Sequence, residues 1–350
     1  MQEKKIIKAS PLESQLEIFI VTYNRAAELK KTFFYMQKTP FVNCSLVIFD
    51  NCSTDETQQV CQEILLSNVF KGMKVVRHPY NIGGNANILK VFQSATFNYT
   101  WILADDDYIE PEGWDDVIAE IQKGDAASIL LNTKLTKKHD ESYYASSRGK
   151  HFTWDDLIKN QGCHFNALAF VPNSINRLDL IRKHLAEAAM FCGFSFPHLA
   201  MHTLADKNTI YYCSKNSLIQ CNISDERTGG RLYYPLPLYY LRTYQFIEDK
   251  KLRSYAISQM WKMRGGERTP LRIWAVTFLS LGVRYNFNLS KKIRIAGEIF
   301  LFSNPMGRFF ALLLFPLIFI PSQWVAAAYY LLTRKKLVFK VKEELQRGRI

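Results

Sequence analysis

The sequence lacks the cysteine patterns of a disulfide-stapled or zinc-binding protein. Its 350 residues contain seven cysteines, an odd number, and no two of them form a Cys-x-x-Cys pair. A disulfide framework and a structural zinc site are therefore not expected, and a reducing cytoplasm fits the composition. The first ten residues are basic but lack an apolar stretch, so we expect no signal peptide.

Acidic residues are scarce in the last hundred positions. Residues 250–350 hold 19 Lys and Arg against four Glu and no Asp, whereas residues 1–249 hold 26 basic and 28 acidic residues. The formal net charge of +13 therefore arises from the C-terminal part. Such asymmetry indicates a region that meets an anionic surface.

One long apolar stretch stands in this basic region. Residues 309–332 carry no charge, and a run of 24 residues is long enough to span a bilayer. Pro316 and Pro321 interrupt it, and basic residues stand on both sides. We interpret it as a re-entrant or interfacial helix pair with both ends cytoplasmic. A buried helix of a soluble domain is the alternative.

The chain up to position 135 alternates between apolar runs and amphipathic stretches. Strands are predicted over residues 16–21, 46–49, 74–77, 99–103 and 128–131. A helical pattern lies between successive runs, and Asn24 is the predicted cap of the first helix. This alternation predicts βαβ units and a largely parallel sheet.

The pattern weakens after residue 131. We predict a polar loop over 134–150, a strand over 165–171, a helix over 174–190, and short strands over 210–212 and 218–221. Helical, basic and aromatic character follows from residue 233 onward. The predicted domains are 1–232, with halves at about 15–135 and 136–232, and a helical basic region at 233–350.

Polar residues directly follow four of the predicted strands. They are Thr22, Asp50, the turn at Gly83, and Asp105. In parallel sheets the ligand binds outside the carboxyl ends of the strands, so we expect these turns to form a nucleotide or phosphate site.

Three adjacent carboxylates, Asp105, Asp106 and Asp107, follow the fourth strand. They repel one another, and a hard divalent cation such as Mg²⁺ or Mn²⁺ would relieve that repulsion. A solvated turn before the next helix is the alternative interpretation.

Four short motifs carry a resemblance to a known family. In chain order they are Val21-Thr22-Tyr23-Asn24-Arg25, Asp50-Asn51-Cys52-Ser53-Thr54-Asp55, Asn81-Ile82-Gly83-Gly84-Asn85 and Ala104-Asp105-Asp106-Asp107. Together they resemble the family 2 glycosyltransferases over residues 15–135, about a third of the chain. With Phe196-Pro197-His198-Leu199 further on, the sequence is most similar to bacterial sugar transferases that build O-antigen or capsule repeat units.

The resemblance implies a GT-A fold, which is Rossmann-like, with a mostly parallel sheet flanked by helices. It also implies residue roles. The implied donor-binding residues are Thr22, Tyr23, Arg25, Asp50, Asp55, Asn81, Gly83, Gly84, Asp105 and Asp106. Asp50 would accept from the nucleotide base, and Asp55 would support its loop. Asp107 would hold Mn²⁺ or Mg²⁺ against the donor diphosphate, and Asp105 would face either the ribose or that metal. Arg227, in a Gly-containing loop, is a candidate phosphate clamp.

The sequence departs from the family at the general base. Many members carry a Glu-Asp pair after the Asp-x-Asp motif, and no such pair occurs between Asp107 and Tyr244. His198 stands in its place, and an imidazole can serve as a base. His202 and Asp206 would share its face if the segment is helical. A packed or capping role for His198 is the alternative.

The resemblance and the basic C-terminal region together predict an inverting glycosyltransferase. Its expected partners are a nucleotide-diphosphate sugar, a lipid-linked oligosaccharide acceptor and an anionic membrane surface. The expected location is the cytoplasmic face of the bacterial inner membrane, with peripheral or monotopic attachment. A nucleotidyltransferase acting on sugar phosphates is one alternative, disfavoured because residues 22–28 contain no glycine. A membrane- or nucleic-acid-binding protein is another, but no nucleic-acid-binding motif occurs.

Overall fold

A computed structural model describes residues 11–136, 139–142, 147–160, 168, 170–190, 197–220, 236–261, 288–320 and 324. The chain divides into two compact units. The first consists of Met1–Cys192 and Ala205–Asn222, and the second of Gly193–Leu204 and Ile223–Ile350. The domain boundary expected at residue 232, the greater part of the strand expected over 165–171, and Arg227 all lie outside the described residues.

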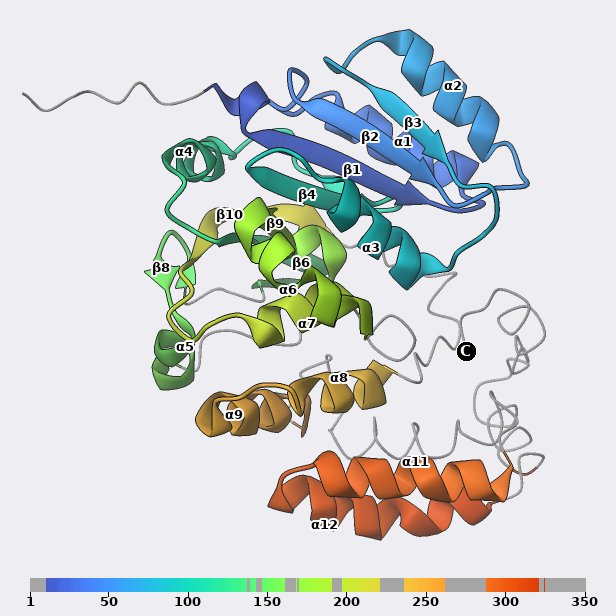
Figure 1. Ribbon diagram of the computed structural model, residues 1–350, viewed down its shortest axis with the longest axis vertical. Coiled ribbons are helices and arrows are strands. Elements are labelled where there is room, and N and C mark those ends of the chain that lie inside the picture. Colours follow the sequence, from blue (N-terminus) through green and yellow to red (C-terminus); the bar gives the residue numbers. More distant parts are fainter. Residues whose placement is uncertain are drawn as a thin grey trace, which may run out of the picture. The chain divides into compact units, whose positions relative to one another are not determined.

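The first unit is built on one large mixed sheet (Figure 1). Its strands are β1 (Leu16–Thr22), β2 (Ser45–Asp50), β3 (Lys74–Arg77), β4 (Tyr99–Ala104), β5 (Tyr108–Ile109), β6 (Ser128–Thr136), β7 (His139–Ser142), β8 (His151–Phe152), β9 (Ser174–Arg177) and β10 (Tyr211–Gln220). The spatial order is β3-β2-β1-β4-β9-β6-β10-β5, with β7 beside β6 and β8 beside β10.

The sheet is parallel only in part. Strands β3, β2, β1 and β4 run parallel, as predicted, but β9 lies antiparallel between β4 and β6. The expectation of a mostly parallel sheet is therefore corrected to a mixed one. The helix predicted over 174–190 begins only at Leu178, because residues 174–177 form β9 and pair with strands on both sides.

Helices cover both faces of the first four strands (Figure 1). The helices of the first unit are α1 (Ala26–Met36), α2 (Thr57–Ser67), α3 (Gly84–Ser94), α4 (Asp115–Lys123), α5 (Trp154–Asn160) and α6 (Leu178–Met190). Successive strand residues point to opposite faces. Ile18 joins the buried cluster that includes residues of α1, α2 and α4, whereas Phe19 points the other way and packs on Phe49, with ring centroids 5.6 Å apart.

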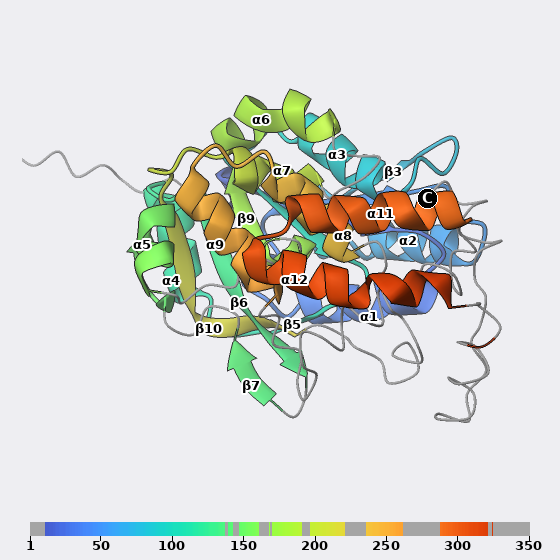
Figure 2. The ribbon, with the colours of Figure 1, turned by 90° about the horizontal axis from the view of Figure 1, so that it is seen from below.

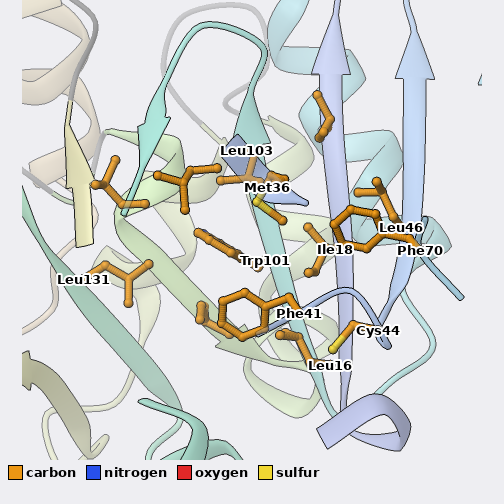
Figure 3. Packing of buried hydrophobic residues seen from close by; sticks show 14 of the residues in the cluster. Leu16, Ile18, Met36, Phe41, Cys44, Leu46, Phe70, Trp101, Leu103 and Leu131 are labelled. Carbon is orange, nitrogen blue, oxygen red and sulfur yellow. The ribbon is translucent and has the colours of Figure 1, made fainter. Parts of the chain in front are cut away.

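The main core lies on the α1 side of the sheet (Figure 3). Trp101 of β4 is fully buried at its centre, and the ring of Phe41 lies 5.5 Å from it. Both faces of β1 are buried, which explains why its sequence is apolar from Ile18 to Val21. The core therefore holds the carboxyl ends of the strands in fixed positions.

Two segments differ from the sequence prediction. Residues 134–136 continue β6 and residues 139–142 form β7, so the loop predicted over 134–150 is partly strand. The two short strands predicted over 210–221 are one strand, β10, with a register shift between Cys213 and Ser217. Asn132 bridges this irregularity, since its backbone N–H donates to Ser214 Oγ at 2.9 Å.

The described part of the second unit is helical. Its helices are α7 (Pro197–Leu204), α8 (Leu236–Tyr244), α9 (Lys250–Trp261), α11 (Leu289–Phe302) and α12 (Pro305–Leu314), followed by a 3₁₀ helix at Phe315–Phe319. The apolar stretch predicted from residue 309 is therefore broken at Phe315, next to Pro316. None of the helices in the described ranges is both long and apolar enough to cross a bilayer.

Candidate active site

The carboxyl ends of the four parallel strands lie level with one another. Thr22 pairs with Asp50, Asp50 pairs with Arg77, and Val21 pairs with Ala104. The loops that follow β1, β2, β3 and β4 consequently meet at one edge of the sheet, as the strand-end argument predicts.

Asp105 connects two of these loops. Its Oδ2 accepts a hydrogen bond from Thr22 Oγ1 at 2.6 Å, and its Oδ1 accepts one from Arg25 Nη1 at 2.8 Å. The same Arg25 nitrogen lies 2.7 Å from Asp106 Oδ2. Asp105 is 3% exposed, whereas the Arg25 side chain is 30% exposed and can still reach a ligand.

Burial sets the electrostatics of this group. It raises the pKa of Asp105 to about 6, against the lowering effects of Arg25 and of the Thr22 hydroxyl. Burial also lowers the pKa of Arg25, but the charges of Asp105 and Asp106 more than offset this, so that pKa is raised and Arg25 stays charged.

Asp107 lies directly before β5 and is also buried, with 3% of its surface exposed. The hydroxyl of Thr32, on α1, donates to the Asp107 carbonyl oxygen at 3.2 Å. Tyr35 and Tyr108 pack edge to face beside this contact, with ring centroids 4.4 Å apart. Helix α1 thus fixes the backbone of the acidic turn.

Asp50 is engaged by the protein on both carboxylate oxygens. Ser53 N–H donates to its Oδ1 at 2.9 Å, and Arg77 Nη1 lies 2.5 Å from its Oδ2. Arg77 Nη2 also donates to the Ser53 carbonyl at 2.9 Å. The sequence analysis missed Arg77, although its place as the last residue of the strand beside β2 was a usable signal.

Asparagines join the loops into one layer. Asn24 adopts φ 51°, its backbone N–H donates to Ser53 Oγ, and its Oδ1 accepts from Thr54 N–H at 2.7 Å. It therefore bridges two loops and does not cap α1, whose N-cap residue is Arg25. Asn51 Nδ2 donates to Asn81 Oδ1 at 2.8 Å.

The loop after β3 is held in the same way. Asn81 Oδ1 also accepts from Gly83 N–H at 2.8 Å, and Asn51 Oδ1 accepts from Ile82 N–H at 2.9 Å. Gly83 adopts φ 85°, which disfavours any residue with a Cβ, and Gly84 begins α3. Open space surrounds both glycines on the Cβ side.

Asp55 and Tyr23 complete the predicted donor-binding set within the first unit. Asp55 is exposed, and its Oδ1 accepts from Thr57 N–H at 3.0 Å at the start of α2, so it supports its own loop. Tyr23 is half-buried in the loop after β1.

The three candidates for the base lie in two different units, Asp206 in the first and the two histidines in the second. Helix α7 ends at Leu204, so Asp206 does not continue the face of His198 and His202. Asp206 accepts from Asn208 N–H at 2.8 Å and lines a cavity of about 330 Å³ with Asp125. That cavity lies beside the amino ends of β6 and β10, at the opposite edge of the sheet from Asp105, so the structure argues against Asp206 as the base.

His198 and His202 lie on α7 in the second unit and are 2% and 0% exposed. Burial, with a smaller effect of His198, lowers the pKa of His202 to about 3. A base is most effective when its pKa is near the working pH, so His202 is a poor candidate. The part that His198 plays in catalysis stays a prediction.

The acidic turn fits a cation that takes much of its coordination from a ligand. The described residues contain no group of three or more His, Cys, Asp or Glu arranged to hold a metal ion. Mg²⁺ is usually bound through one or two carboxylates together with substrate phosphates and water. Asp105 already accepts hydrogen bonds from Thr22 and Arg25, one on each carboxylate oxygen.

Comparison with known proteins agrees with this geometry. Residues 17–185 match Glycosyl transferase family 2. Over 184 residues the chain is 23% identical to Glycosyltransferase GlyG of Streptococcus pneumoniae serotype 4, an alignment that covers 50% of this chain and 59% of that protein. The chain therefore spans less than two thirds of this curated relative.

Solved structures show the same fold. S. aureus TarS 1–349 matches with a TM-score of 0.55 at 14% sequence identity, over 91% of each chain. Its complex with UDP-GlcNAc also matches with a TM-score of 0.55, at 15% identity, over 82% of this chain and 80% of that chain. The fold is accordingly GT-A-like, with a curled mixed sheet flanked by helices, and the segment of this fold that matches the model of Glycosyl transferase family 2 is residues 17–185.

Proposed function

We propose that this protein is an inverting glycosyltransferase that moves a sugar from a nucleotide-diphosphate donor to a lipid-linked glycan acceptor in bacterial surface polysaccharide synthesis. The observation that carries the proposal is the layer of interlocked loops at the carboxyl edge of β1–β4, within a family 2 domain. In this layer Arg25, partly exposed, is held by two carboxylates. The complex of TarS with UDP-GlcNAc supports a nucleotide sugar as donor.

The residues of the acidic turn would act on the donor diphosphate. Asp105 positions Arg25, and Arg25 stabilises the negative charge that grows on the leaving diphosphate. Asp107 would hold Mn²⁺ or Mg²⁺, which supplies further positive charge against that leaving group when bound. Asp50 and Arg77 support the loop from Asn51 to Asp55, where the nucleoside would lie.

Inversion requires a base on the face of the sugar opposite the leaving group. We propose His198 for this role: its imidazole would take the proton of the attacking acceptor hydroxyl. The absence of a Glu-Asp pair between Asp107 and Tyr244 supports a histidine here.

We further propose that the protein works at the cytoplasmic face of the inner membrane, attached peripherally or monotopically. The excess of Lys and Arg after residue 250 supports this location. A lipid-linked acceptor would be presented at the same surface.

The proposed function is tested by thermal unfolding with nucleotide sugars. A ligand that binds the folded state stabilises it, so UDP-, GDP- and dTDP-sugars are screened with and without Mn²⁺. We expect one of them to raise Tm in a Mn²⁺-dependent manner. Asp107→Asn should abolish the shift, while Asp125→Asn, an exposed carboxylate at the opposite edge, should leave it unchanged. An equal shift in both variants would contradict the assignment of the donor site.

A further inference from the structure

Helices α11 and α12 form a hairpin in the second unit. Figure 2 shows them side by side, joined by Ser303 and Asn304. Asn304 caps α12, since its Oδ1 accepts from Gly307 N–H at 2.8 Å. The turn is therefore defined by the sequence and sets the two helices antiparallel.

One face of α12 packs in the usual way. Gly307, Ala311 and Leu314 are buried, and their spacing of four and three residues places them on one side of the helix. Ile295 and Ile299 of α11 are buried in the same hairpin. This packing accounts for only one apolar face of α12.

The opposite face of α12 is also apolar. Met306 is 59% exposed, Phe309 64%, Leu312 63% and Leu313 56%. At about 100° per residue, these four positions cluster on the side away from Gly307 and Ala311. A surface helix of a soluble domain normally carries polar residues there, so a helix that is apolar on both sides needs a second apolar environment.

The exposed apolar surface continues beyond α12. Leu301, at the end of α11, is 63% exposed, and Phe319 in the 3₁₀ helix is 52% exposed. Six large apolar side chains of the hairpin and the 3₁₀ helix are thus more than half exposed, and apolar side chains exposed in such numbers mark an interaction site.

Cations accompany this patch. Lys291, Lys292, Arg294 and Arg308 lie on the hairpin, and the one acidic residue between positions 288 and 320, Glu298, is paired with Arg242 at 2.6 Å. Exposed apolar side chains beside an excess of cations are typical of helices that lie on anionic lipid. A nucleic acid would leave the apolar face in water, and a second copy would bring like charges together.

We propose that the apolar face of α12, formed by Met306, Phe309, Leu312 and Leu313, inserts into the interfacial layer of an anionic bilayer with the helix axis in the membrane plane, and that Leu301 of α11 and Phe319 of the 3₁₀ helix extend the contact. The proposal deepens the membrane attachment of the proposed function. It concerns the described residues of the hairpin and overlaps the start of residues 309–332, for which the sequence predicted a re-entrant or interfacial helix pair. Binding to vesicles involves neither donor nor acceptor, so its outcome is separate from that of the transferase assignment.

The test is flotation of the full-length protein with vesicles of phosphatidylcholine and phosphatidylglycerol in a molar ratio of about seven to three, compared with pure phosphatidylcholine. The protein is expected to float with the anionic vesicles, and less so in high salt, which screens the charges. Phe309→Ser combined with Leu312→Ser should lower the partition coefficient by about tenfold or more, because two large side chains no longer leave water. Phe34→Ser combined with Leu66→Ser removes comparably exposed side chains from the first unit and should have no effect.

A Phe309→Trp variant keeps the test decisive if the double variant misfolds. Brominated lipids should quench its added fluorescence, and should not quench that of a Leu66→Trp control. Flotation of the double variant at the level of the unaltered protein, or absence of binding to anionic vesicles, would overturn the proposal. So would a drop from dimer to monomer in the double variant by light scattering, since the face would then be an interface between copies.

Discussion

Replacing Arg77 with methionine is expected to destabilise the first unit because it leaves the Asp50 carboxylate without its guanidinium partner. Asp50 is 2% exposed, and Arg77 donates to its Oδ2. Removing one partner of a buried ion pair typically costs about 3–5 kcal/mol of unfolding free energy. The Arg77 side chain is 35% exposed, so water can partly replace it, and we expect about 2–3 kcal/mol.

Replacing the other partner, Asp50, should lower the free energy of unfolding by a smaller amount. In Asp50→Asn the buried charge is gone, and Arg77 can turn to water while it keeps the Ser53 carbonyl as acceptor. The hydrogen bond from Ser53 N–H to residue 50 is weakened, and the expected loss of unfolding free energy is about 1 kcal/mol. The double variant should resemble Asp50→Asn, which gives a coupling energy of about 2–3 kcal/mol in magnitude between the two side chains.

The assay is urea unfolding followed by circular dichroism, with Lys30→Met as the matched control. Lys30 forms an exposed pair with Glu63 at 3.2 Å, and such pairs add almost nothing to stability. A loss in Arg77→Met no larger than that in Lys30→Met, or a greater loss in Asp50→Asn than in Arg77→Met, would refute the reasoning from burial.

Three further predictions concern catalysis and pH. Asp107→Asn should abolish transfer and the metal-dependent part of donor binding while the fold survives; full activity, or undiminished activity in excess EDTA, would contradict the metal role. His198→Ala should lower kcat by about 10²–10⁴-fold with donor affinity nearly unchanged, measured by steady-state kinetics against donor titration; a normal kcat would place the base elsewhere. His202 has a folded-state pKa of about 3 against an ordinary 6.5, so the unfolded chain takes up a proton first and stability should fall as pH drops from about 6.5 towards 3. His202→Phe should reduce the dependence of the unfolding free energy on pH, measured by urea unfolding between pH 7 and pH 4. An unchanged dependence would show that His202 is not its source.

The order of the elements and the polar strand ends up to position 135 could be predicted from the amino-acid sequence. Strands β1 to β4 and helices α1 to α3 follow the predicted pattern, because period and apolar content are local properties of the chain. Thr22, Asp50 and Asp105 could be assigned to one edge of the sheet from the sequence alone, because the carboxyl ends of neighbouring parallel strands lie at the same edge.

Which side chains contact one another at that edge depends on the three-dimensional fold. Arg25 reaches Asp105 across 80 residues of sequence, and Arg77 reaches Asp50 across 27. Such pairs depend on strand order and register, which no local pattern specifies. The same holds for Asp206, which is near His202 in sequence yet stands at the opposite edge of the sheet from Asp105.

In the second unit too, the sequence predicts the kind of elements, whereas the packing determines which side chains are buried. Composition predicted basic helices after residue 233, but it could not say which apolar side chains α11 and α12 bury against each other. The capped turn at Asn304 determines how α12 packs on α11. One face of α12 is buried as a result, whereas Phe309 and Leu312 stay exposed. Burial is a property of the packed hairpin, since a helix that is apolar on both sides can hide only one of them against a single neighbour.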